Sequence, residues 1–293
     1  MEKIPDKIKA LNEVREPGCL AVLQDRKYFF TGNMCIKRTL RRHEWFTIDN
    51  VLYNSPPTTI PQRWKNDVAI ITYLRERTNI PLPELPCVYE DDGAFYHCTK
   101  YVDGIQMSKL TPEDQTIVMQ ELRQHVAVLK TLKSDTPGVP PFPTLPIPRF
   151  GPYEEDTAQR IERHTLETKL AGSLLVPPPN VVNTASMRNF CFRPRKNVRG
   201  NFVLCHNDLR PHNVLVDPKT LKIKAIIDWE FAGFLPEWFE LKMGETKDPN
   251  SEYAKRCRKW FSENCHEVPM QDLPTMEEKL GVKYVAPLDK RER

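Results

Sequence analysis

The sequence predicts an α+β protein with two lobes, a small N-terminal lobe built on an antiparallel sheet and a mostly helical C-terminal lobe. Three short strand patterns stand close together between residues 19 and 38, and a helical pattern follows at 62–78. A second hairpin pattern at 88–102 and a helix start at Thr111 come next. This order of strands, helix, hairpin and helix predicts the two-lobed layout.

We expect the lobes to divide at residue 102. Residues 1–102 would form the N-terminal lobe and residues 103–293 the C-terminal lobe, because Asp103-Gly104 interrupts the strand pattern there. With 293 residues and 40% hydrophobic content, the chain is long enough to bury a sizeable core and to form both lobes.

Composition and charge argue against several classes of protein. The net charge of +4 is too small to predict nucleic-acid binding, because 43 Lys and Arg residues are nearly balanced by 39 Asp and Glu residues. The 8 cysteines include no CxxC pair, so reduced thiols in a cytoplasmic protein are the simplest expectation. No run of about 18 apolar residues occurs, so no membrane span is expected.

Alternation, turn residues and helical spacing predict the elements of the first lobe. Strands are expected at 19–23, 28–31 and 34–38, with Gly32-Asn33 in a tight turn between the last two. In the helix that follows, apolar residues recur at helical spacing, and Asn79-Ile80-Pro81 ends it. These apolar residues are Trp64, Val68, Ile71 and Leu74.

The second hairpin and the second helix each carry a local signal. Asp92-Gly93 is a dipeptide typical of a tight hairpin turn. Thr111 is placed to cap a helix, with Pro112 at the first helical position and acidic residues in the first turn. Apolar residues at helical spacing extend this helix to about Leu132.

Residues 137–200 have the least regular pattern. Proline at every second or third position makes 137–148 an extended connection rather than a helix or strand. The insert at 151–200 can contain one further helix, at 154–175. Because long irregular segments are often functional, this insert either covers a substrate or is a poorly ordered insertion.

The most informative stretch is the polar hairpin, residues 205–234. Strands at Val214–Val216 and Lys222–Ile227 flank the turn Asp217–Thr220, and polar side chains gather at the outer ends of both strands. They are His206, Asp208, Asn213, Asp228 and Glu230. Carboxylates and an amide at one rim suit a divalent cation with oxygen ligands and a phosphate-bearing substrate.

Two motifs in the polar hairpin carry a resemblance to a known family. Residues 206–213 read HNDLRPHN, an HxDxxxxN arrangement, and residues 227–233 read IDWEFAG. Together they resemble the aminoglycoside phosphotransferase and choline kinase family, most closely its fungal branch. Segments 74–83 and 101–104 share this likeness, which covers roughly residues 30–135 and 200–240. The resemblance implies a protein-kinase-like two-lobed fold.

The resemblance also implies a reaction, in which the γ-phosphoryl group of ATP passes to a hydroxyl of a small molecule with Mg²⁺ as cofactor. Asp208 would hold the acceptor hydroxyl and take its proton. Asn213 and Asp228 would bind Mg²⁺, which bridges the ATP phosphates. His206 is expected to be structural, and Glu230 to act beside the metal ligands or on a second metal.

Nucleotide binding is where this chain departs from the family. Lys37 stands where the family's lysine binds the α- and β-phosphates, and the simpler alternative is a solvated lysine at a strand end. The helix residue that pairs with this lysine is normally Glu. Asp67 occupies the matching position and is one methylene shorter, so we expect that ion pair to be stretched or water-bridged. The glycine-rich phosphate loop is missing between the first two strands.

Other notable side chains have simpler interpretations. Trp229 and Trp238 are expected to pack under the polar hairpin rather than to stack on a substrate. A basic cluster before Phe202 is expected to be a solvated face, with the binding of an acidic substrate as the alternative. This cluster comprises Arg193, Arg195, Lys196 and Arg199.

Three functions are compatible with the sequence. The first is a small-molecule kinase; a protein substrate is disfavoured, because Pro236-Glu237 follows Asp228 by only 8 residues and leaves no room for an activation segment. The second is a catalytically impaired kinase-like module that binds a ligand or partner, suggested by Asp67 and the missing glycines. The third is a scaffold that uses its proline-rich segment as a peptide ligand. The acceptor, the choice of ATP or GTP and the oligomeric state are not specified.

Overall fold

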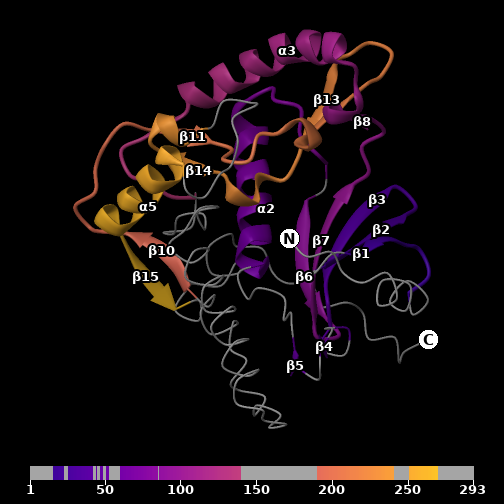
Figure 1. Cartoon of the computed structure of the whole chain (residues 1–293), viewed down its shortest axis with the longest axis horizontal. Coiled ribbons are helices and arrows are strands. Elements are labelled where there is room, and N and C mark those ends of the chain that lie inside the picture. The colour runs from indigo at the N-terminus through magenta and orange to yellow at the C-terminus, as the bar shows by residue number, and fades with distance from the viewer. Residues whose placement is uncertain are drawn as a thin grey trace.

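The structure of the chain, a computed structural model, describes residues 16–22, 26–41, 44, 47–48, 51–52, 60–84, 86–139, 190–240 and 251–269. Within these residues it is an α+β fold, as predicted, with a small antiparallel sheet in the N-terminal part (Figure 1). The helix expected at 154–175 and most of the connection expected at 137–148 lie outside the described residues. None of the described helices combines the length and the apolar character of a membrane-crossing segment.

Five strands form the N-terminal sheet in the order β1-β2-β3-β7-β6, and every neighbouring pair is antiparallel. They are β1 (Cys19–Val22), β2 (Arg26–Thr31), β3 (Met34–Thr39), β6 (Cys87–Asp91) and β7 (Ala94–Lys100). The predicted turns are confirmed: Gly32 has φ +58°, and Asp92 and Gly93 have φ +47° and +65°. Glycine adopts this left-handed conformation without strain, which explains its place in both turns.

Helix α2 (Ile60–Arg77) follows the first three strands and lies beside the sheet (Figure 1). The apolar side chains that predicted this helix, Trp64, Val68, Ile71 and Leu74, are all buried. After the helix ends, the carbonyl of Pro81 accepts a hydrogen bond from the amide of Ile226 at 2.9 Å. This bond ties the end of the helix to the polar hairpin, 145 positions later in the chain.

Two further helices belong to the C-terminal part. Helix α3 (Pro112–Thr131) begins as predicted, because the Thr111 hydroxyl accepts a hydrogen bond from the amide of Asp114 at 3.2 Å. Helix α5 (Glu252–Asn264) was not predicted, although it has the same kind of cap, with the Ser251 hydroxyl 3.2 Å from the amide of Ala254.

Short strands complete the C-terminal part. One sheet has the order β13-β12-β8 and contains the polar hairpin, and a second has the order β14-β11-β9. Their strands are β8 (Ile105–Gln106), β9 (Lys133–Ser134), β11 (Phe202–Cys205), β12 (Val214–Val216), β13 (Ile223–Ile226) and β14 (Gly233–Leu235). A separate two-stranded sheet in the C-terminal part pairs β10 (Phe190–Pro194) with β15 (Cys265–Pro269). Another, in the N-terminal part, pairs β4 (Thr47–Ile48) with β5 (Val51–Leu52).

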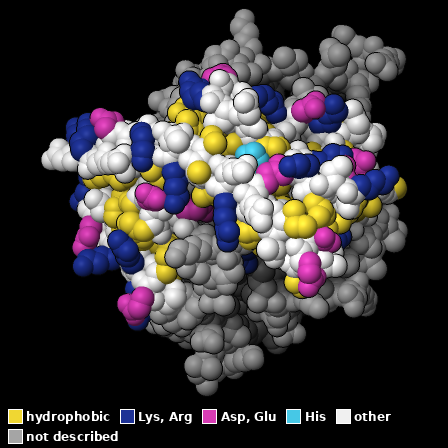
Figure 2. All heavy atoms as spheres, turned by 90° about the horizontal axis from the view of Figure 1, so that it is seen from above, with side chains coloured by type: hydrophobic (Ala, Val, Ile, Leu, Met, Phe, Trp, Pro, Cys, Tyr) yellow, Lys and Arg dark blue, Asp and Glu magenta, His cyan; other side chains and the backbone are white. Residues whose placement is uncertain are grey.

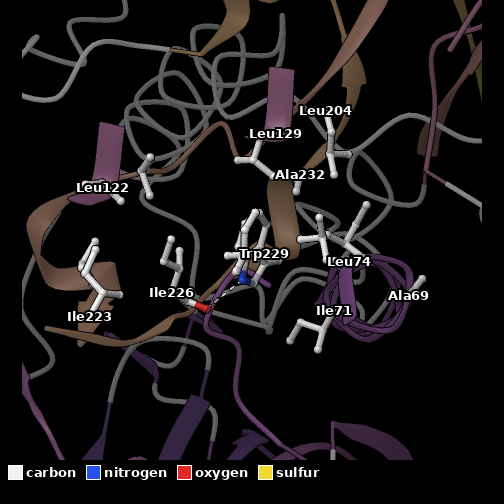
Figure 3. Close-up of a cluster of buried hydrophobic side chains, with 14 of the residues drawn as sticks. Ala69, Ile71, Leu74, Leu122, Leu129, Leu204, Ile223, Ile226, Trp229 and Ala232 are labelled. Atoms are coloured by element: carbon white, nitrogen blue, oxygen red, sulfur yellow. Dashed lines mark hydrogen bonds between the residues drawn. The ribbon is translucent and has the colours of Figure 1, made fainter. Parts of the chain in front are cut away.

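Trp229 lies at the centre of the main hydrophobic core (Figure 3). It begins the short 3₁₀ helix η5 (Trp229–Phe231), is fully buried, and donates a hydrogen bond from its indole Nε1 to the carbonyl of Ile226 at 2.8 Å. Ile71 and Leu74 of α2 lie on one side of the ring, and Leu122 and Leu129 of α3 belong to the same cluster. A buried tryptophan with a satisfied N–H is a strong packing anchor, so this core fixes the position of the segment that follows Asp228.

Candidate active site

His206 supports the loop that carries Asp208. The imidazole is fully buried; its Nε2 donates to the carbonyl of Ile227 at 3.0 Å, and its Nδ1 accepts the amide of Asp208 at 3.2 Å. Burial lowers the pKa of His206, which agrees with the neutral ring that these two bonds require. The predicted structural role of His206 is confirmed, since it joins the loop after β11 to the end of the polar hairpin.

Two residues that the sequence did not single out hold the same loop. Asn207 has φ +63°, and its side-chain amide donates to the carbonyl of Phe231 at 2.8 Å. The carboxylate of Glu240 accepts the amides of His206 and Asn207, the latter at 3.3 Å. Asparagine tolerates the left-handed conformation better than most residues. The presence of asparagine at position 207 is the one feature of the local sequence that could have indicated this tight turn.

Asp208 and Asn213 are joined directly. The side-chain nitrogen of Asn213 donates to the backbone carbonyl of Asp208 at 2.8 Å, and Asn213 is buried. Because the nitrogen is used, the side-chain oxygen of Asn213 is the atom that can bind a metal. Asp208 is buried, with 7% of its surface exposed, and its carboxylate lies 3.5 Å from the Nε of Arg210.

Asp228 is held next to Asn213. The amide of Ile227 donates to the carbonyl of Asn213 at 2.9 Å, and Asp228 then adopts the left-handed conformation, with φ 62° and ψ 54°. Aspartate adopts this region more readily than most non-glycine residues. The structure therefore brings together the three predicted residues of the polar hairpin: Asp208, Asn213 and Asp228.

Lys37 reaches this group from strand β3. Its ammonium group forms an ion pair with the carboxylate of Asp228, and both side chains are largely buried. Burial alone lowers the pKa of Lys37, but the charge of Asp228 outweighs it and raises the pKa above its ordinary value. For Asp228 burial raises the pKa, and the charge of Lys37 outweighs it and lowers the pKa. Both groups are therefore charged at neutral pH.

Asp67 makes no direct ion pair with Lys37, in keeping with the stretched or water-bridged pair expected, although its charge contributes to the raised pKa of Lys37. Its buried carboxylate accepts the amide of Trp229 at 2.7 Å and the Nε2 of His97, on β7, also at 2.7 Å. The short aspartate side chain on α2 meets the start of η5, and both of its oxygens accept hydrogen bonds there. Its predicted part in nucleotide binding stays a prediction.

Glu230 and its partners connect elements from both parts of the chain. Its carboxylate pairs with the guanidinium of Arg63 on α2 and lies 3.8 Å from the Nη1 of Arg26 on β2. The Arg63 guanidinium also lies 4.8 Å from the centre of the Phe231 ring. Glu230 therefore links β2 and α2 to η5. The sequence analysis did not predict this structural role.

The residues present fit a magnesium ion. Mg²⁺ prefers oxygen ligands and is held by one or two carboxylates together with phosphates and water, which matches Asp228 and the side-chain oxygen of Asn213. No group of three or more His, Cys, Asp and Glu residues gathers into a metal site among the described residues. Asp228 and Asn213 would supply part of a coordination shell, which nucleotide phosphates and water would complete.

The remaining predictions concern tryptophans and basic residues. Trp229 is buried in the core, as predicted, and Trp238 packs against Phe239, with the Arg256 guanidinium 3.9 Å from its ring centre. In the basic cluster, Arg193 is half-buried, and the other members, Arg195, Lys196 and Arg199, are exposed as predicted. On the face seen from the side of α3, basic and acidic side chains are interspersed (Figure 2).

The family model of the phosphotransferase enzyme family matches residues 51–244. The chain belongs to this family. The matched region contains α2, the loop with Asp208 and Asn213, and the metal-binding candidate Asp228. Membership in the phosphotransferase family agrees with the predicted α+β, kinase-like two-lobed fold.

Solved structures of aminoglycoside phosphotransferases are similar to this phosphotransferase-family chain. Aminoglycoside-3'-phosphotransferase of type VIII is 18% identical, with coverage of 80% of this chain and 79% of that chain and a TM-score of 0.42. ADP-bound APH(2'')-Ib is 14% identical, with coverage of 88% and 82% and a TM-score of 0.43. A thermostable mutant of APH(4)-Ia, crystallised with AMP-PNP and hygromycin B, is 14% identical, with coverage of 80% and 75% and a TM-score of 0.41.

A search of curated proteins found no match.

Proposed function

We propose that the protein transfers the γ-phosphoryl group of ATP to a hydroxyl of a small molecule, with Mg²⁺ as cofactor. The observation that supports this most is the convergence of Asp208, Asn213 and Asp228 at one rim, with Lys37 paired to Asp228. Family membership supports phosphoryl transfer in general. The small-molecule acceptor follows from the short segment after Asp228, which leaves no room for a protein-kinase activation segment.

Asp228 and Asn213 would hold Mg²⁺ through their side-chain oxygens. The ion supplies charge neutralisation for the β- and γ-phosphates when bound. Asn213, a proposed metal ligand, and Asp208, the proposed base, lie five positions apart on one loop. The hydrogen bond from the Asn213 side chain to the Asp208 carbonyl would fix the distance between the metal and the base.

Lys37 would bind the phosphates of the nucleotide. Its raised pKa keeps the ammonium group charged at neutral pH, and an ammonium group is a compact donor for phosphate oxygens. In the structure its charge is balanced by Asp228. Phosphates that enter the site would share Lys37 with this carboxylate.

Asp208 would act as the base. The hydroxyl proton of the acceptor passes to the Asp208 carboxylate, the acceptor oxygen forms a bond to the γ-phosphorus, and the bond from that phosphorus to the bridging oxygen breaks, which releases ADP. The Nε of Arg210 lies 3.5 Å from this carboxylate.

The impaired-module alternative is less well supported, because all three residues of the rim are present and held together. Three further predictions from the sequence accompany this proposal. They are the likeness to the fungal branch of the family, a cytoplasmic location and a lobe boundary at residue 102.

Nucleotide binding and turnover test the proposal. Thermal melts with MgATP should show a rise in melting temperature, since a ligand at 100 times its Kd adds about 2.7 kcal/mol of stability. ATP turnover should then be compared across amino alcohols, aminoglycosides and hydroxylated metabolites. No stabilisation at millimolar MgATP, together with no acceptor-dependent turnover, would sink the proposal.

A further inference from the structure

Asp67 connects three elements that meet behind the candidate active site. From α2, one carboxylate oxygen accepts the amide of Trp229 at 2.7 Å, and the other accepts the Nε2 of His97 at 2.7 Å. Asp67 and His97 are both less than 5% exposed. A buried carboxylate needs donors for its oxygens, and these two bonds supply them without Lys37.

His97 occupies a specific place in the N-terminal sheet. In the ladder between β3 and β7 it stands directly opposite Lys37, so both side chains project from the same face. The imidazole also packs against Trp64 of α2, with ring centres 5.8 Å apart. His97 is therefore fixed by both the sheet and the helix, and it presents one ring nitrogen to Asp67.

The amide that Asp67 accepts belongs to the residue directly after Asp228. Asp228 has φ 62°, a left-handed conformation that aspartate adopts more readily than most residues, and bonds on both sides hold it there. On one side, the amide of Ile227 is bound to the carbonyl of Asn213 at 2.9 Å. On the other side, the amide of Trp229 is bound to Asp67, and the Trp229 ring lies in the core beside α2 (Figure 3).

We propose that Asp67 and His97 are positioning residues that hold the Asp228–Trp229 backbone, so that the Asp228 carboxylate faces Lys37, and that Asp67 is not a shortened partner for that lysine. This inference rests on the proposed function for its kinetic consequences, while its structural part stands independently. The helix thereby acts on the metal-binding carboxylate through a backbone amide.

The substitution Asp67→Glu distinguishes a role in positioning Asp228 from a role as the ion-pair partner of Lys37. If Asp67 were a shortened partner of Lys37, Asp67→Glu would restore a direct ion pair and leave kcat unchanged or higher. If it positions Asp228, the longer side chain displaces the carboxylate from the Trp229 amide, and we expect kcat to fall at least about tenfold. The KM for the nucleotide should stay within about threefold, because Lys37 is untouched. An unchanged or higher kcat overturns the proposal.

His97 is tested by a conservative and a disruptive variant. Gln can present a side-chain N–H near the position of the imidazole Nε2, so His97→Gln should keep at least about half of kcat, whereas His97→Leu should lower it at least about tenfold. Glu76→Gln, at an exposed position on α2, is the matched control and should behave as the wild type. Equal losses in His97→Gln and His97→Leu would contradict a role through the hydrogen bond.

Amide hydrogen exchange tests the structural part without any turnover. In Asp67→Ala, a peptide that contains Trp229 should exchange at least about tenfold faster than in the wild type, while peptides from β11 keep their rates. Unchanged exchange at Trp229 overturns the proposal, as does faster exchange throughout the chain. If the wild type transfers no phosphate, the proposed function fails, and this exchange result alone decides whether Asp67 holds the Trp229 amide.

Discussion

Lys37 on strand β3 and Asp228 after strand β13 form an ion pair, although 191 positions of the chain separate them. The pair joins the N-terminal sheet to the loop with the candidate metal ligands, and each charge shifts the pKa of the other in the direction that keeps both ionised. A nucleotide phosphate and a metal ion would meet at this point, so the pair is the natural place to test ligand binding.

Replacing Lys37 by Met should weaken nucleotide binding. A hydrogen bond to a charged group contributes about 1.5–3 kcal/mol, so we expect the Kd for MgATP to rise about 10–100-fold. Thermal melts over a range of MgATP concentrations measure this change. Lys196→Met, on an exposed turn, is the matched control. An unchanged Kd in Lys37→Met would show that Lys37 does not contact the nucleotide.

Replacing Asp228 by Asn should remove the effect of magnesium. The wild type should gain more thermal stability from ATP with Mg²⁺ than from ATP with a chelator, because carboxylate oxygens are strong Mg²⁺ ligands. In Asp228→Asn this difference should disappear, and phosphoryl transfer should fall at least about 100-fold. A magnesium-dependent stabilisation that survives the substitution would exclude Asp228 as the main metal ligand.

Glu230 should affect stability and not metal binding. It pairs with Arg63 and is close to Arg26, and breaking such a buried pair from one side costs about 3 kcal/mol or more. Glu230→Gln should therefore unfold at a lower denaturant concentration, with its Mg²⁺ response intact. Glu237→Gln, which removes the exposed pair with Lys130, is the control and should unfold at the same denaturant concentration as the wild type. Loss of the Mg²⁺ response would instead support the predicted second-metal role of Glu230.

A second group of buried charged side chains involves strands β2 and β3 of the N-terminal sheet, which carry Lys27 and Arg38. Glu44 accepts hydrogen bonds from Lys27 at 2.7 Å and from two nitrogens of Arg38 at 2.7 and 2.8 Å. Burial alone raises the pKa of Glu44, but the bonds from Arg38 and Lys27 outweigh it and lower the pKa to about 2. Since the folded pKa is depressed, the stabilisation is complete above the ordinary value of 4.5 and is lost as pH falls toward about 2.

Replacing Glu44 by Gln should flatten the acidic limb of the stability curve. The wild type should lose on the order of 3 kcal/mol between pH 4.5 and about 2 through this group. Glu44→Gln should be less stable at neutral pH, because Lys27 and Arg38 keep only one carboxylate partner, Glu16, and it should change less as pH falls. Urea unfolding at several acidic pH values measures both effects, with Glu84→Gln as an exposed control. Parallel curves for wild type and Glu44→Gln would contradict the assignment.

The sequence predicted features that depend on neighbouring residues. The Thr111 cap and the Asp92-Gly93 turn are local, and both are present. Asp208, Asn213 and Asp228 span a single hairpin, so their spacing alone was enough to place them together. Helix α5 also had a local signal in Ser251 and in the helical spacing of Ala254, Cys257 and Phe261, which the sequence analysis did not use.

The contacts that sequence reasoning missed join distant parts of the chain. The pairing of β3 with β7 puts His97 opposite Lys37, and no hairpin specifies that pairing. The partner of Asp67 depends on how α2 packs against η5, which residue type and spacing do not determine. The family pattern predicted a stretched or water-bridged pair between Lys37 and Asp67, but it did not predict the direct partners that packing gives them, Asp228 for Lys37 and His97 for Asp67.

The central claim is that Asp208 takes the proton of an acceptor hydroxyl during transfer of the γ-phosphoryl group. The most direct measurement follows the γ-labelled phosphate of ATP onto an acceptor from the panel, at saturating MgATP, for the wild type, Asp208→Asn and the exposed control Asp135→Asn. We predict a labelled phosphate ester, a rate at least about 100-fold lower in Asp208→Asn, and a wild-type rate in Asp135→Asn. Equal rates in the wild type and Asp208→Asn would contradict the claim.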